Sequence, residues 1–178
     1  MTILGIDPGT MCTGYGIVKK QKGSLILVIQ GAINLPPRKP LPLKLEIIYN
    51  EIDKIIRLYK PDEFAIETAF YGKNVQSAMK IGYARGVAIL AAVHNKLPVS
   101  EYSPREVKKS VVGYGAANKR QVQYMINHLL GTKDKEMKFD ESDALAVAIC
   151  HSFRMGSLLP KKNSWKSFIE ANPERVIA

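Results

Sequence analysis

The first 34 residues contain three apolar, strand-like segments that are separated only by short glycine-containing turns. These segments are Thr2–Asp7, Thr13–Lys19 and Ser24–Ile33, and Lys22-Gly23 marks the second turn. Strands joined by short turns pair in an antiparallel manner, because parallel pairing needs a long crossover connection. The start of the chain therefore predicts an antiparallel meander, to which all later elements must be added.

Helical and strand-like segments alternate after this meander. A proline-rich connection, Leu35 to Pro42, leads to a helix that ends at Tyr59. The later elements that we expect are a strand over Glu63–Glu67, a helix over 74–95, a strand over Leu97–Tyr102, a helix capped by Ser103, and helices over Asn118–Leu130 and Asp140–Met155. Strands that are entered through helical crossovers join a sheet in parallel. We therefore predict an α/β fold with a mixed five-stranded sheet, three antiparallel strands plus two parallel ones, flanked by helices.

The length of 178 residues is typical of one domain with its own core. We assign this domain to residues 1–156 and interpret residues 157–178 as a C-terminal tail that is expected to be poorly ordered. The formal net charge is +10, and residues 71–138 hold 12 basic against 4 acidic side chains. Such a concentration of positive charge is typical of a protein that binds nucleic acid, although a solvated basic face explains it equally well.

Two cysteines, Cys12 and Cys150, are present, and neither belongs to a Cys-x-x-Cys pair. This argues against a disulfide framework and against a structural zinc site. No signal peptide is visible, and the longest fully apolar run, Val87–Val93, is too short to span a membrane. We expect a cytoplasmic protein that does not bind membranes.

Four carboxylates stand at positions that suit a metal-dependent nuclease. Asp7 and Glu67 each end an apolar strand, while Asp140 and Asp143 open an apolar helix. If the two strands are parallel neighbours, Asp7 and Glu67 lie about 4.8 Å apart at the backbone. Carboxylates this close repel one another unless a cation or a shared proton lies between them. Oxygen ligands of this kind favour Mg²⁺ or Mn²⁺ over zinc, and two such ions support phosphoryl transfer.

Each carboxylate also has a structural explanation when it is taken alone. Asp7 is followed by a Pro-Gly turn, Asp140 is a suitable N-cap, Asp143 suits the first turn of a helix, and Glu67 can face water at a strand end. Only their coincidence with a predicted α/β fold and a basic surface favours a metal site. We assign Glu63 and Glu141 to solvent.

Several motifs, in order from about residue 2 to residue 153, resemble the RuvC family of crossover junction endodeoxyribonucleases. They are Gly5-Ile6-Asp7-Pro8-Gly9-Thr10, Thr13-Gly14-Tyr15-Gly16, Phe64-Ala65-Ile66-Glu67, Lys73-Asn74, Ala84-Arg85-Gly86-Val87-Ala88, Val111-Val112-Gly113 and Asp143-Ala144-Leu145-Ala146. The resemblance implies an RNase H-like fold and an enzyme that resolves Holliday junctions during homologous recombination and DNA repair. It also implies that Asp7, Glu67, Asp140 and Asp143 are a catalytic tetrad that binds two Mg²⁺ ions, which Mn²⁺ can replace.

The resemblance further implies direct hydrolysis that leaves a 5′-phosphate and a 3′-hydroxyl, with a homodimer making paired symmetric nicks in a four-way DNA junction. A RuvA-RuvB branch-migration complex is the implied partner. Phe70 falls where the family places an aromatic side chain that stacks on a base, a contact of about 1–3 kcal/mol, and Tyr71 is adjacent. The basic candidates for DNA contact are Lys73, Lys108, Lys119 and Arg120.

Two other functions are compatible with parts of the sequence. An ATP-handling enzyme of the actin and sugar-kinase type shares a related core and an early Asp-x-Gly-Thr loop, but the chain is too short for the duplicated domains of that class. A non-catalytic module that binds junctions is the second alternative. Such a module does not require the four acids, so their presence argues against it.

Overall fold

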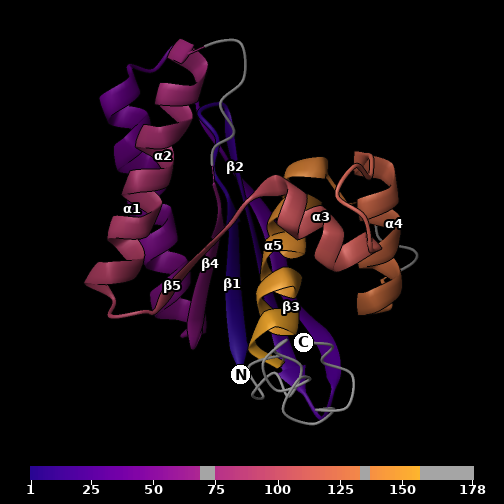
Figure 1. The fold of residues 1–178 in the computed structure, drawn as a ribbon. Helices are drawn as coiled ribbons and strands as arrows, with labels where there is room; N and C mark the ends of the chain where they lie inside the picture. Colours follow the sequence, from indigo (N-terminus) through magenta and orange to yellow (C-terminus); the bar gives the residue numbers. More distant parts are fainter. Residues whose placement is uncertain (69–74, 133–136, 157–178) are drawn as a thin grey trace, which may run out of the picture.

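The computed structural model describes residues 1–68, 75–132 and 137–156, and it consists of a central sheet with helices on both faces (Figure 1). The five strands follow the order β3-β2-β1-β4-β5. Their bounds are Thr2–Asp7 for β1, Cys12–Gln21 for β2, Ser24–Asn34 for β3, Glu63–Glu67 for β4 and Val99–Tyr102 for β5. Strands β1, β2 and β3 pair in an antiparallel manner, and β4 pairs in parallel with both β1 and β5. The mixed sheet expected from the sequence is confirmed.

The helices divide into two groups, one on each face of the sheet (Figure 1). Helices α1 (Leu41–Tyr59) and α2 (Val75–His94) cover one face; α3 (Pro104–Val112), α4 (Lys119–Leu130) and α5 (Phe139–Gly156) cover the other. Neighbouring residues of β1 enter different cores: Ile3 packs with α5, whereas Leu4 packs with α1 and α2. Since successive side chains of a strand point to opposite faces, both faces of β1 are buried.

Several element boundaries differ by one or two residues from those expected from the sequence, and the first residues of α1, β5 and α5 differ for a reason that the structure shows. Helix α1 begins at Leu41, so Pro42 lies in its first turn, where its missing N–H breaks no helical hydrogen bond. Strand β5 begins at Val99, because the N–H of Leu97 still donates to Ala92 O of α2 at 3.0 Å. Helix α5 begins at Phe139, so Asp140 is a first-turn residue and not the N-cap.

Helix α5 lies unusually close to the sheet, because two strands present glycines to it. A Cβ atom on Gly5 of β1 would lie 2.2 Å from Ala144 O, and one on Gly14 of β2 would lie 1.9 Å from Asp140 O. Any larger residue at these positions would push the helix outward. The two glycines therefore bring the beginning of α5 down onto the end of β1.

Helix α2 packs through its alanines, and its other side is apolar and exposed. Its buried residues are Ala84, Ala88, Ala91 and Ala92, which lie in the core with α1. Its exposed apolar residues are Val75, Met79, Tyr83, Leu90 and Val93. The sequence left open whether the apolar residues of this helix pack on the core or form a contact surface. Its alanines pack on the core, and the apolar residues on its other side are exposed.

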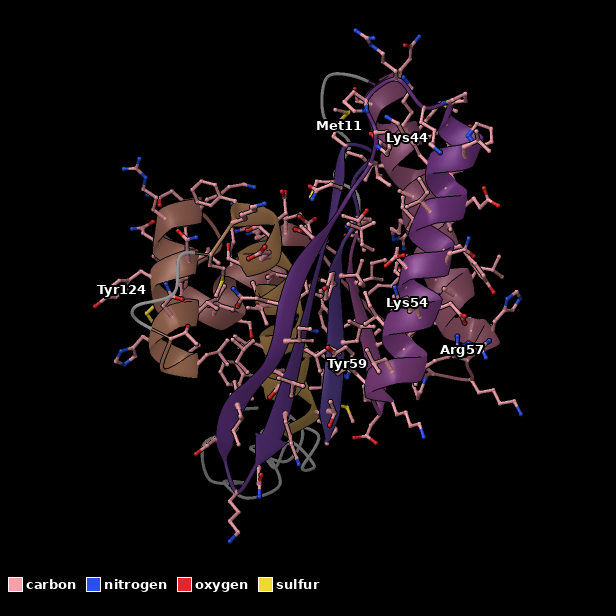
Figure 2. All side chains as sticks on the ribbon, turned by 180° about the vertical axis from the view of Figure 1, so that it is seen from behind. Met11, Lys44, Lys54, Arg57, Tyr59 and Tyr124 are labelled. Atoms are coloured by element: carbon pink, nitrogen blue, oxygen red, sulfur yellow. The ribbon has the colours of Figure 1, made fainter. Side chains whose placement is uncertain are left out.

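Helix α1 packs on the same face of the sheet through its buried isoleucines, and its outer side carries charged residues. Figure 2 shows Lys44 near its beginning, close to Met11, with Lys54 and Arg57 further along the helix. Among the helices of residues 1–68, 75–132 and 137–156, none is both long and apolar enough to cross a membrane.

Candidate active site

The parallel register of β1 and β4 brings Asp7 and Glu67 together. Ile6 is paired with Ile66, so the next residue of each strand is a carboxylate. Asp7 is two residues beyond Gly5 and therefore faces α5, because side chains alternate along a strand. The Asp7 and Glu67 carboxyl groups share a hydrogen bond. The adjacency predicted from the two strand ends is thus present.

Both carboxyl groups of this pair have raised pKa values. Burial raises the pKa of Asp7 well above its usual range, and the charges of Glu67 and Asp143 raise it further. Burial and the charge of Asp143 likewise raise the pKa of Glu67, against the opposing effects of Asp7, Lys119 and Lys108. The site therefore favours either a shared proton or a cation between these groups.

Helix α5 supplies the two remaining acids, and each already has a partner. Lys119 Nζ, from α4, donates to Asp143 Oδ2 at 2.6 Å. This contact raises the pKa of Lys119 although burial opposes the shift. Asp140 contacts the Cys12 thiol, whose pKa rises to about 11 because of burial and this hydrogen bond. No sequence signal pointed to Cys12, because its contact depends on how closely α5 approaches β2.

One pocket of about 220 Å³ joins these elements. Asp7, Glu67 and Asp143 line it together with Lys108 of α3 and Lys119 of α4. Asp140 lies beside this pocket and acts on Asp7 through its charge. The pocket thus combines acids that can bind cations with lysines that can bind phosphate.

The donor set fits a hard divalent cation in its chemistry, because the acids present oxygen ligands, and burial together with the charges of neighbouring acids raises the pKa of Asp7 and of Glu67. Within the described residues, no group of three or more acidic, histidine or cysteine side chains is arranged to hold a metal ion. Asp143 contacts Lys119, and Asp140 contacts the Cys12 thiol.

Some predicted DNA contacts lie elsewhere. Arg120 lines a second pocket together with Tyr124 and is not among the residues that line the acid pocket. Tyr124 points outward from α4 (Figure 2). Phe70, Tyr71 and Lys73 lie outside the described residues.

The expectation that Glu63 and Glu141 face solvent was wrong. Glu63 Oε2 lies 3.6 Å from Nε2 of the buried His151. Glu141 accepts a hydrogen bond from Gln30 Nε2 at 3.3 Å and another from the Lys138 N–H. The contacts with His151 and Gln30 bridge elements that are far apart in the sequence, which explains why the local pattern could not predict them.

Comparison with known proteins shows the family of this chain. Residues 3–151 match the family model of crossover junction endodeoxyribonuclease RuvC. The chain belongs to the RuvC family. A RuvC of Chloroherpeton thalassium is 42% identical over 185 residues, covering 99% of this chain and 100% of the relative. A RuvC of Citrifermentans bemidjiense is 51% identical over 156 residues, covering 88% of this chain and 94% of the relative.

The fold agrees with a solved RuvC structure. The RuvC of Thermus thermophilus, in complex with Holliday junction substrate, superposes with a TM-score of 0.81 at 31% identity, covering 88% of this chain and 97% of the other. This similarity confirms the RNase H-like fold predicted for the described core. Both the family and the fold that the motifs implied are therefore confirmed.

Proposed function

We propose that this RuvC protein is a crossover junction endodeoxyribonuclease that resolves Holliday junctions by paired symmetric nicks. The observation that carries the proposal is the pocket in which Asp7, Glu67 and Asp143 meet Lys108 and Lys119. Membership of the RuvC family and similarity to a RuvC structure with junction DNA support the substrate class. Recombination and DNA repair are the processes that require this reaction.

We propose that the family's dependence on a divalent metal is met here by two Mg²⁺ ions, which Mn²⁺ can replace. Asp7, Glu67, Asp140 and Asp143 would hold them, since these four acids supply hard oxygen ligands at one end of the sheet. Bound there, such ions supply Lewis-acid stabilisation of the scissile phosphate and activation of water. The acids must lose their shared proton first, because a protonated carboxyl group is a poor ligand.

The lysines have a separate role in this proposal. Lys108 and Lys119 enter the acid pocket from two different helices, so the phosphate backbone can be held from two sides. Phe70, Tyr71, Lys73 and Arg120 remain proposed DNA contacts, the first for base stacking. Hydrolysis without a covalent enzyme intermediate leaves a 5′-phosphate and a 3′-hydroxyl.

A homodimer suits this reaction, because two sites related by a two-fold axis match two symmetric nicks. The exposed apolar residues of α2 support it. Val75, Met79, Tyr83, Leu90 and Val93 recur at helical spacing on the side opposite the buried alanines. An apolar stripe of this kind is typical of a surface that is covered by a partner. The proposed partner is a branch-migration complex of the RuvA-RuvB type, and the proposed location is the cytoplasm.

The experiment that tests the proposed chemistry separates binding from cleavage. Asp7→Asn keeps the size of the side chain but removes the charge that holds a cation. We expect this variant to bind a four-way junction as the unchanged protein does and to lose cleavage. Loss of junction binding together with cleavage would show that Asp7 is needed mainly for the fold. End-labelling of the products of the unchanged protein tests the predicted 5′-phosphate and 3′-hydroxyl.

A further inference from the structure

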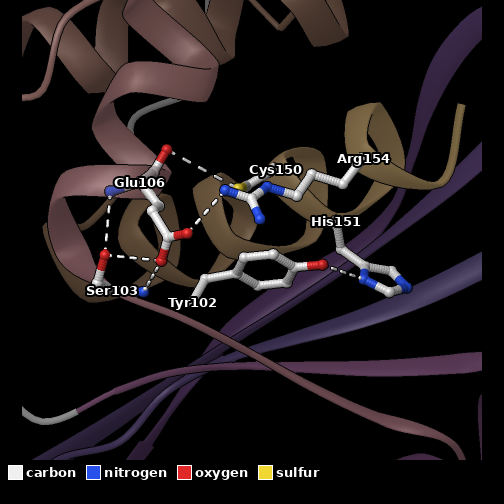
Figure 3. A network of polar contacts seen from close by, with 6 residues as sticks. All are labelled: Tyr102, Ser103, Glu106, Cys150, His151 and Arg154. Atoms are coloured by element: carbon white, nitrogen blue, oxygen red, sulfur yellow. Dashed lines mark hydrogen bonds and ion pairs between the residues drawn. The ribbon is translucent and has the colours of Figure 1, made fainter. Parts of the chain in front are cut away.

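A network of polar contacts links the beginning of α3 to α5 (Figure 3). Ser103 caps α3, and Glu106 Oε2 accepts hydrogen bonds from the Ser103 N–H at 2.9 Å and from its hydroxyl at 2.7 Å. The other carboxylate oxygen, Oε1, accepts from Arg154 Nη2 of α5 at 2.7 Å. Glu106 therefore caps its own helix with one oxygen and holds a second helix with the other.

Arg154 is itself held in place by an aromatic side chain. Its guanidinium lies over the ring of Tyr102, 5.4 Å from the ring centre, which is a favourable arrangement for a cation and an aromatic ring. The Tyr102 hydroxyl is 2.8 Å from Nδ1 of the buried His151, also on α5. Tyr102 is in turn the register partner of Glu67 in the sheet. The network thus joins β5, α3 and α5 around one aromatic residue.

The helix held in this way carries Lys108 to the acid pocket. Pro104, Val107 and Lys108 of α3 all line it, and the charge of Lys108 lowers the pKa of Glu67. Lys108 follows Glu106 by two residues, so a shift of the first turn of α3 moves the lysine with it. Because the Glu106–Arg154 pair is about half exposed, it contributes little to global stability. Its main effect is then on where α3 lies.

We infer that Glu106 and Arg154 are positioning residues for Lys108. They hold α3 on α5 so that the Lys108 ammonium group faces the acids of Asp7, Glu67 and Asp143, where it meets the phosphate that is cleaved. This inference rests on the proposed function, because it assigns Lys108 to the reaction proposed above. A positioning role differs from a merely structural one. In a structural role, loss of the Glu106–Arg154 ion pair would lower cleavage by lowering the stability of the whole domain.

A double-mutant cycle tests the inference. Glu106→Gln retains an oxygen for the Ser103 cap but removes the charge that pairs with Arg154, and Lys108→Met removes the positioned group. With enzyme in excess, we expect Glu106→Gln to lower the single-turnover rate of junction cleavage by about three- to tenfold. In the Lys108→Met background the same change should have no further effect. Equal factors in both backgrounds would overturn the inference.

Three controls separate positioning from general damage. Arg57→Met removes an exposed ion pair of α1, in which Arg57 Nε lies 2.7 Å from Asp53 Oδ2, and should leave cleavage unchanged. Thermal melting should shift no more for Glu106→Gln than for Arg57→Met. Arg154→Lys keeps the charge and should retain more activity than Arg154→Met.

A measurement that does not depend on activity distinguishes the positioning of Lys108 from the proposed nuclease function. Lys108 is half-buried and Lys109 is exposed, so reductive methylation of Lys108 can be measured against Lys109 as an internal reference. We expect Glu106→Gln to raise the relative modification of Lys108. If Glu106→Gln leaves the relative methylation of Lys108 as it was, the inference that Glu106 positions Lys108 is refuted, even if the protein without substitutions cleaves junctions. A protein that shows the expected modification but cleaves no junction would instead contradict the proposed function.

Discussion

Lys119 Nζ lies 2.6 Å from Asp143 Oδ2, on the wall of the pocket that Asp7 and Glu67 also line. A side chain predicted to contact DNA is thus paired with an acid predicted to bind metal. The lysine supplies positive charge where two neighbouring carboxyl groups have raised pKa values. A divalent cation at Asp143 has to compete with this ammonium group.

Lys119→Met should therefore strengthen metal binding while weakening the reaction. Without the ammonium group, we expect the affinity for Mg²⁺ to rise by about two- to fivefold, which corresponds to the loss of one partly exposed ion pair. Cleavage at saturating Mg²⁺ should fall, because a phosphate contact is lost. Isothermal titration calorimetry and single-turnover cleavage measure the two effects. Lys54→Met, on the outer side of α1, is the control, and a weaker Mg²⁺ affinity in Lys119→Met would contradict the competition.

The raised pKa values of Asp7 and Glu67 predict that the metal-free protein loses stability as the pH rises. Above the usual carboxyl range, near pH 4, the folded state holds protons that the unfolded state has released. The free energy of unfolding then falls with increasing pH until the folded pair is ionised. Denaturant unfolding in the presence of a chelator, between about pH 5 and pH 8, measures this slope. Asp7→Asn should flatten it, and an equal slope in both proteins would show that the slope does not arise from this carboxyl pair.

The close contact of Gly14 with α5 predicts a cost for any side chain at this position. A Cβ atom there would lie 1.9 Å from the backbone oxygen of Asp140, so Gly14→Ala should cost about 1–3 kcal/mol of unfolding free energy. Gly82→Ala of α2 is the control, because a Cβ there would meet no heavy atom of another element within 4 Å. It should cost less than about 1 kcal/mol. Chemical denaturation compares the two, and similar costs would contradict the role of Gly14 in seating α5.

The apolar stripe of α2 predicts where a dimer can be broken. Met79 is 54% exposed, so Met79→Lys should leave the fold of one chain intact and weaken the dimer by more than about tenfold. Leu58→Lys changes a side chain of α1 that is 67% exposed and should leave the dimer unaffected. Sedimentation equilibrium measures both. A dimer that tolerates Met79→Lys would place the interface elsewhere.

The sequence predicted the features that depend on strands and missed those that depend on helix packing. The pairing of Asp7 with Glu67 follows from two apolar strands that end in acids and lie side by side, so local pattern was sufficient. The contact of Asp140 with Cys12 depends on the depth at which glycines seat α5, and no periodicity encodes that depth. Glu63 was assigned to solvent for a similar reason, since its partner His151 lies on α5, the last helix of the chain.

Cleavage of a synthetic mobile four-way junction, compared with linear duplex of the same sequence and with and without Mg²⁺, tests the central proposal most directly. We expect paired, symmetric nicks in the junction that require the metal, with little cutting of the duplex. Equal cutting of both DNAs, or junction cleavage that persists in the presence of a chelator, would contradict the proposed function.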